Sequence, residues 1–92
     1  MARERELIPI ADLSGDYWLI WSPSRRAALN RILDRDPEVN VMLLWSNQSD
    51  AGAFAAASQR FDDGLPRCLP IYAIRDWFEC TAAWVDLPPS EA

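Results

Sequence analysis

The chain has 92 residues, a length typical of one domain, and its 14 acidic residues against nine arginines give a formal net charge of −5. It has no lysine and no histidine, which excludes a histidine general base, histidine-dependent nucleophiles and histidine metal ligands. The acidic balance argues against direct nucleic-acid binding, which needs an electropositive face, and favours a protein partner with a basic surface.

Two further exclusions concern membranes and cysteine chemistry. Apolar runs such as Tyr17–Trp21 are far shorter than the about 20 residues of a membrane helix, and the charged N-terminus lacks a signal-peptide core. We therefore expect a soluble, cytoplasmic protein without a membrane segment. Two cysteines cannot make a four-thiolate zinc site. Cys68 and Cys80 are expected to be reduced, with a disulfide as the alternative.

The first predicted elements are strands. Residues Glu6–Ile10 suggest a short strand, and Pro9 places it at a sheet edge because proline cannot donate to a ladder. Tyr17–Trp21 is apolar at every position, which indicates a strand covered on both faces. Val39–Trp45 has the same character and predicts another buried strand.

Three helices are predicted between and after these strands. Ser22 as N-cap and Pro23 at the first position start a helix that runs to about Arg35 and stops at Asp36-Pro37. This helix would carry four of the nine arginines: Arg25, Arg26, Arg31 and Arg35. The second helix is expected over residues 50–61. The third is expected over 70–85 from its apolar periodicity, with a strand over 68–74 as the alternative.

Together these elements predict a single small domain over residues 1–86 with a flexible tail at 87–92. Leu19-Ile20-Trp21-Ser22 recurs as Leu43-Leu44-Trp45-Ser46, which indicates two consecutive strand–helix units. The expected fold is α/β, with α+β as the alternative, in the order β-β-α-β-α-α. Helices would pack on a three-stranded mixed sheet whose two inner strands are parallel and joined by a right-handed crossover.

Polar residues follow both inner strands, where open α/β sheets bind ligands. Helix N-termini attract anions, and Arg25 is expected to point across the top of the sheet. The predicted anion site comprises Ser22, Ser24, Arg25, Ser46, Asn47 and Ser49. Capping hydrogen bonds and an ion pair of Arg25 with Asp50 or Asp16 are the structural alternative.

A second set of residues is predicted to meet a protein partner. Acidic clusters at the ends of the first two helices would present an electronegative edge, and two tryptophans seven apart on the third helix would form a ridge. This ridge would bind the partner or a second copy of the chain, giving a homodimer. The set comprises Asp34, Asp36, Glu38, Asp62, Asp63, Trp77 and Trp84. Solvated loop charges and core tryptophans are the alternative.

The sequence favours a non-catalytic protein-binding module, an acidic inhibitor that occludes a basic, nucleic-acid-handling surface on its partner. Phage anti-defence (anti-CRISPR-like) proteins and bacterial immunity or antitoxin proteins share this size and charge, an analogy of class alone. The alternatives are a small anion-binding or phosphate-binding domain or enzyme that uses the predicted helix N-termini, and a structural subunit of a larger assembly. No metal or cofactor is predicted, because no glycine-rich phosphate loop or metal-ligand spacing occurs.

Overall fold

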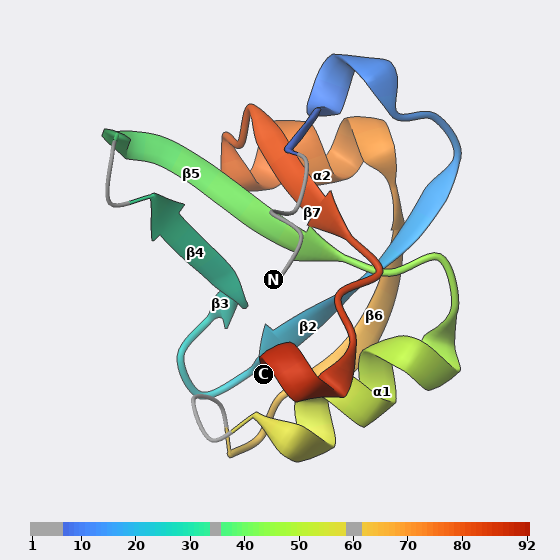
Figure 1. Ribbon diagram of the computed structural model, residues 1–92. Coiled ribbons are helices and arrows are strands. Elements are labelled where there is room, and N and C mark those ends of the chain that lie inside the picture. The colour runs from blue at the N-terminus through green and yellow to red at the C-terminus, as the bar shows by residue number, and fades with distance from the viewer. Residues whose placement is uncertain (1–6, 34–35, 59–61) are drawn as a thin grey trace, which may run out of the picture.

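Two β-sheets form the centre of the protein (Figure 1). The computed structural model describes residues 7–33, 36–58 and 62–92, with backbone alone for 31–33 and 36–39. The four-stranded sheet has the order β1 (Ile8–Pro9), β7 (Ala82–Val85), β5 (Asp36–Leu44) and β4 (Asn30–Leu33). Its β5 and β7 are parallel and its other pairs antiparallel. The three-stranded sheet is antiparallel, in the order β3 (Ala27–Ala28), β2 (Asp16–Ser22) and β6 (Leu65–Pro70).

Backbone hydrogen bonds join the two sheets near the middle of the molecule. Trp18 and Trp45 exchange N–H···O bonds of 2.8 Å in each direction, forming an antiparallel bridge between β2 and the end of β5. Between β3 and β4, the Leu29 N–H donates to the Ile20 carbonyl at 2.9 Å. The segment from β3 to β4 thus pairs first with β2 and then with β5.

Alternating side chains of the central strands fill two apolar cores. On β2, on β5 and at Trp45 directly after β5, the side chains alternate: Leu19, Met42 and Leu44 enter one core, while Ile20, Leu43 and Trp45 enter the other. Because successive strand residues point to opposite faces, a strand covered on both sides is apolar throughout. The prediction that Tyr17–Trp21 has two covered faces is confirmed.

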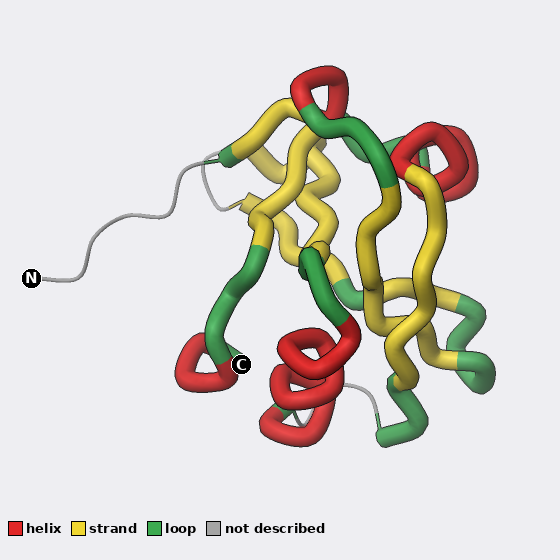
Figure 2. The backbone as a smooth tube through the Cα atoms, turned by 90° about the vertical axis from the view of Figure 1, so that its right-hand side faces the viewer, coloured by secondary structure: helices red, strands yellow, loops and turns green. Residues whose placement is uncertain are grey.

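The described residues form two α-helices, which cover these two cores. Helix α1 (Gln48–Ala57) puts Ala51 and Phe54 into the core that holds Trp45, and α2 (Ile71–Phe78) puts Ile74 into the other. Short 3₁₀ turns, η1 (Ile10–Asp12) and η2 (Pro89–Glu91), lie near the two ends of the described chain. In Figure 2, η2 lies beside α1, with which it is in contact.

The predicted edge position of the first strand is confirmed, since β1 is the outermost strand of its sheet. The C-terminal segment that was expected to be a tail begins with Leu87, which is only 2 % exposed. Its carbonyl accepts a hydrogen bond of 2.9 Å from Trp45 Nε1. The fold is α+β, the alternative that the sequence left open.

The predicted first helix is wrong. Residues 23–26 form a turn, and β3 and β4 follow where the helix was expected, so Arg25, Arg26 and Arg31 do not share a helix; Arg35 lies outside the described residues. Pro23 suits a turn as well as a first helical position, and Ser22 continues β2. The parallel inner strands are wrong for the same reason. A turn and the strands β3 and β4, rather than a crossover helix, follow β2, and β2 and β5 meet antiparallel at Trp18 and Trp45.

The other helix boundaries also change. Asp36-Pro37 begins β5, whereas a helix stop was expected there. The second helix begins at Gln48, slightly earlier than predicted, and ends at Ala57. The predicted third helix ends at Phe78, and its second half contains β7. For residues 68–74, each interpretation holds in part, because β6 runs to Pro70 and α2 begins at Ile71.

Candidate binding site

A surface hollow lies on one face of the β2–β6 strand pair. Leu19 lies opposite Arg67 in the register, and Tyr17 lies opposite Leu69. Opposed residues of an antiparallel pair project to the same face. Arg67 and Leu69 of β6 therefore share a face with Leu19 and Trp21 of β2. The last turn of α2 borders this face.

These elements enclose a cavity of about 340 Å³, which we call the Arg–Trp hollow. It is lined by Leu19, Trp21, Arg26, Arg67, Leu69, Trp77 and Phe78. The rings of Trp21 and Phe78 are 6.0 Å apart at an angle of 53°, a tilted aromatic contact that fixes the wall. Trp77 is 68 % exposed, the most exposed of the large apolar side chains described.

A second cavity of about 460 Å³ adjoins the hollow, and the two share Arg26, Trp77 and Phe78. Asn30 and Asn40 also line it and connect three elements. Asn30 Nδ2 donates to Asn40 Oδ1 at 2.6 Å, and Asn40 Nδ2 donates to the Phe78 carbonyl at 3.1 Å. This chain of amides ties β4 and β5 to the end of α2, and so holds Phe78 in place.

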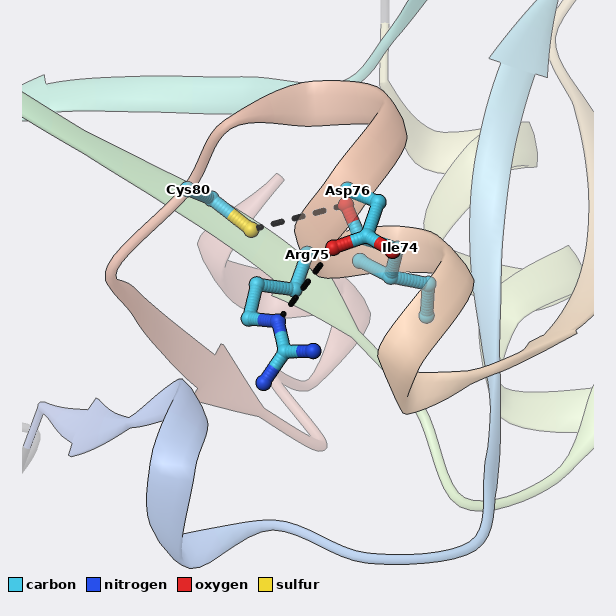
Figure 3. Close-up of polar contacts among 4 residues, drawn as sticks. All are labelled: Ile74, Arg75, Asp76 and Cys80. Atoms are coloured by element: carbon cyan, nitrogen blue, oxygen red, sulfur yellow. Dashed lines mark hydrogen bonds and ion pairs between the residues drawn. The ribbon is translucent and has the colours of Figure 1, made fainter.

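The charge around these cavities is opposite to the charge of the chain. Among arginines whose side chains are described, Arg25, Arg26 and Arg67 line one or both cavities, and the fourth, Arg75, does not. Arg75 Nε lies 3.4 Å from Asp76 Oδ1, and Figure 3 shows this exposed ion pair on α2. No described acidic side chain lines either cavity. The hollow is therefore a cationic site on an acidic protein.

The turn that carries Arg25 and Arg26 is held by a carboxylate. Asp63 accepts a 2.6 Å hydrogen bond from Ser22 Oγ and a 2.9 Å hydrogen bond from the Ser24 N–H. The hydrogen bond from the Ser22 hydroxyl has the largest effect and that from the Ser24 N–H the second largest, and these bonds lower the pKa of Asp63 to about 2. Arg26 has a left-handed backbone with φ of +50°, a conformation that costs an L-residue energy. Asp63 thus fixes the strained turn from which Arg26 reaches the hollow.

The structure does not bring together the two halves of the predicted anion site. Ser22 lies four residues beyond Trp18, about 13 Å along the strand, while Ser46 adjoins Trp45, which pairs with Trp18. Each half instead binds one of the protein's own carboxylates. Ser46 donates to the Asp86 carboxylate from its N–H at 2.8 Å and from its hydroxyl at 2.9 Å. Ser22 and Ser24 donate to the Asp63 carboxylate.

The remaining predicted anion-site residues have other placements. Asn47 caps α1, with its side-chain oxygen accepting from the Asp50 N–H at 2.8 Å. Ser49 is exposed on the first turn of α1. The expected inward position of Arg25 on a helix is wrong, because Arg25 is an exposed turn residue whose N–H donates to Ser22 Oγ at 3.3 Å.

The predicted partner-binding residues are also dispersed. Trp77 is exposed on α2, but Trp84 is on β7 and packs against the core that contains Trp45, so they form no ridge. Asp62 is exposed and Asp63 holds the β2–β3 turn. Asp34 lies outside the described residues. Asp36 and Glu38 belong to β5, and their side chains are not described.

Sequence reasoning missed most of the hollow. Arg67, Leu69 and Phe78 were not singled out as binding residues, and Arg26 was placed on a helix that does not form. The signal that was available is the segment Leu65–Pro70, in which Pro66, Cys68 and Pro70 alternate with Leu65, Arg67 and Leu69. Such a pattern indicates an edge strand with one side-chain face outward.

Metal binding and membrane insertion find no support in the described residues. No group of three or more Cys, Asp or Glu side chains among them is placed to hold a metal ion. None of the helices in the same ranges has the length and apolar character needed to cross a membrane. Comparison with protein-family models, curated proteins and solved structures finds no match to the chain.

Proposed function

We propose that the protein is a non-catalytic binding module that holds a protein partner in the Arg–Trp hollow. The observation that carries this proposal is the exposed Trp77, which lines the same partly aromatic cavity as Arg26 and Arg67. Tryptophan and arginine are the residues most enriched among those that dominate binding energy at protein interfaces. An apolar floor with a polar rim is the usual anatomy of such interfaces.

A second candidate keeps the acidic surface as the binding face, as the sequence analysis expects of an inhibitor that occludes a basic partner. The observation that favours it is the number of exposed carboxylates outside the hollow. They include Asp12, Asp16, Asp50, Asp62 and Asp86. These residues are spread over several turns and helix ends, and none of them lines either of the two cavities described above. The hollow is the better-defined site.

The two candidates are separated by capturing partners from extracts of the native host with the immobilised protein and quantifying them by mass spectrometry. We expect a partner held by the wild type to be lost with Trp77→Ala and with Arg67→Glu. Matched controls on the same helix are Tyr72→Ala, an exposed aromatic outside the hollow, and Arg75→Glu, both expected to retain the partner. Circular dichroism of each variant confirms the fold.

The acidic-surface candidate makes the opposite prediction. A partner retained by Trp77→Ala and Arg67→Glu but lost with Asp62→Arg would contradict the hollow as the binding face. Asp62 suits this test because it is exposed, and its neighbour Asp63, which holds the turn, is left unchanged.

A further inference from the structure

We infer that the segment seated in the Arg–Trp hollow is an acidic peptide that inserts one aromatic or large aliphatic side chain, an inference that rests on the proposed function. The carboxylates of the peptide would meet Arg26 and Arg67. The inserted side chain would rest on Trp21, Leu69 and Phe78 under the edge of Trp77.

The backbone of β6 favours recognition through side chains over the addition of a strand. The Ile71 N–H donates to the Gly15 carbonyl at 2.9 Å. In the antiparallel register, the backbone N–H and C=O groups of the odd-numbered residues of β6 therefore point toward β2. Pro66, Cys68 and Pro70 consequently face away from β2, and two of these three lack an N–H. A peptide strand at this edge would find one donor in five residues, which is too few for a stable ladder.

The apolar part of the hollow defines the inserted group. Its floor is built from opposed residues on two strands, and the Trp21–Phe78 contact holds one wall at a ring separation of 6.0 Å. Leu65, 57 % exposed, continues the same face of β6 beyond Arg67. Large apolar side chains gain the most from leaving water for a preformed cavity of this kind.

The charged part defines the rest of the peptide. Arg26 and Arg67 enter the hollow from different elements, the β2–β3 turn and β6, so carboxylates on both sides of the inserted residue can each meet a guanidinium. Among the described side chains away from the cavities, Arg75 is the one basic group and acidic groups predominate, so this part of the surface repels an acidic ligand. Charge complementarity therefore restricts such a peptide to this face. It also makes a long nucleic-acid strand, with one charge per nucleotide, the poorer fit.

The inference is tested with synthetic peptides and fluorescence anisotropy at 25 °C. The main probe is an eleven-residue capped peptide with a central phenylalanine flanked on each side by two glutamates in a glycine–serine background. The controls replace the glutamates by glutamines, or the phenylalanine by glycine. Because each exposed ion pair strengthens binding only modestly, we expect binding about tenfold tighter for the glutamate peptide than for the glutamine peptide. Raising the salt from 0.15 M to about 1 M should remove most of this preference.

Variants assign the effect to the hollow. We expect Arg67→Glu and Trp77→Ala each to weaken binding of the glutamate peptide by about tenfold or more, while Arg75→Glu and Tyr72→Ala leave it within about twofold. Arg67→Gln is the milder variant and should remove the preference for glutamate over glutamine in part. Both Arg67 and Trp77 are exposed, so these substitutions test binding in a folded protein.

Four results would overturn the inference. The first two are equal binding of the glutamate and glutamine peptides, and equal binding of the phenylalanine and glycine peptides. The third is a fluorescent single-stranded oligonucleotide that binds more tightly than the glutamate peptide and loses binding with Trp77→Ala. The fourth is a dimer, detected by light scattering, that Trp77→Ala dissociates. The last result would make a second copy of the chain the occupant. If the peptides fail while Trp77→Ala still abolishes partner capture, the proposed function stands and only the acidic occupant is wrong.

Discussion

Asp63 shows how a single carboxylate can replace the ligand that the sequence suggests. The helix-start residues after β2 were predicted to attract an external anion, and the structure places the protein's own carboxylate on Ser22 and Ser24. Sequence alone could not find this contact, because Asp63 is separated from Ser22 by 41 positions. The prediction rested on a helix N-terminus that does not form, and the contact of this segment with a carboxylate depends on tertiary structure.

The hydrogen bonds to Asp63 make stability depend on pH in a defined direction. Its pKa falls from 3.8 to about 2, so folding is favoured by the ionised form. This contribution is complete above about pH 4 and is lost as the pH falls toward 2. We expect the melting temperature of the wild type to fall more steeply over this window than that of Asp63→Asn. Asp62→Asn is the neighbouring control and should retain the wild-type slope; equal slopes for all three would contradict the role of Asp63.

The two cysteines are predicted to differ in reactivity. Both are free thiols, with Cys68 exposed on β6 and Cys80 buried, so the alternative of a disulfide is not realised. Burial raises the pKa of the Cys80 thiol, which lies 3.9 Å from the Ile74 carbonyl (Figure 3). We expect iodoacetamide to modify Cys68 in the native protein and Cys80 only after denaturation. Mass spectrometry with Cys68→Ser checks this, and rapid modification of that variant would contradict it.

At the scale of elements, strands were easier to predict than helices. The runs around Leu19 and Leu43 are apolar because both faces are covered, and their strand character was evident from composition. Ser22-Pro23 fits a helix start and a turn equally well, and the turn is held by the hydrogen bonds to Asp63 and by the pairing of β3 with β2. In residues 70–85, helical periodicity continued by coincidence through Ala82 and Val85, although the chain leaves the helix at Glu79.

The end of α2 offers a direct test of this boundary. Glu79 has a left-handed backbone with φ of +50°, and its N–H bonds to the Arg75 carbonyl at 3.0 Å. Glycine adopts this conformation without the penalty that a Cβ imposes. We expect Glu79→Gly to raise the free energy of unfolding by about 0.5–1 kcal/mol in urea denaturation. Glu79→Ala keeps the Cβ and should give no gain. A loss with glycine would contradict a left-handed helix end.

At the scale of the whole molecule, residue 87 closes the core beneath α1. Leu87 is 2 % exposed, and its carbonyl accepts from Trp45 Nε1, whose ring lies 4.9 Å from that of Phe54. We expect Leu87→Ala to lower the free energy of unfolding by about 2–4 kcal/mol. The exposed Ser90→Ala in η2 is the control and should change stability little. A Leu87→Ala variant as stable as the wild type would show that this core does not depend on Leu87.

The candidate site also belongs to the whole molecule. Composition predicted an acidic protein with clustered arginines, but the cluster was placed on a helix that does not form. The hollow joins Arg26 from a turn, Arg67 from an edge strand and Trp77 from α2, which are distant in sequence. Of its residues, only Trp77 was predicted as a binding residue. Helical spacing in the sequence can indicate that one tryptophan is exposed, but it cannot indicate a cavity formed between elements that are distant in sequence.

The most direct measurement is the ¹⁵N–¹H spectrum of the five tryptophan indoles as the glutamate–phenylalanine peptide is added. Trp21 and Trp77 line the hollow, whereas Trp18, Trp45 and Trp84 pack with the core on the other face of β2. We predict concentration-dependent shifts of the Trp21 and Trp77 indole signals, with the other three changing little. Shifts confined to Trp18, Trp45 or Trp84, or binding with all five signals unchanged, would contradict the Arg–Trp hollow as the binding site.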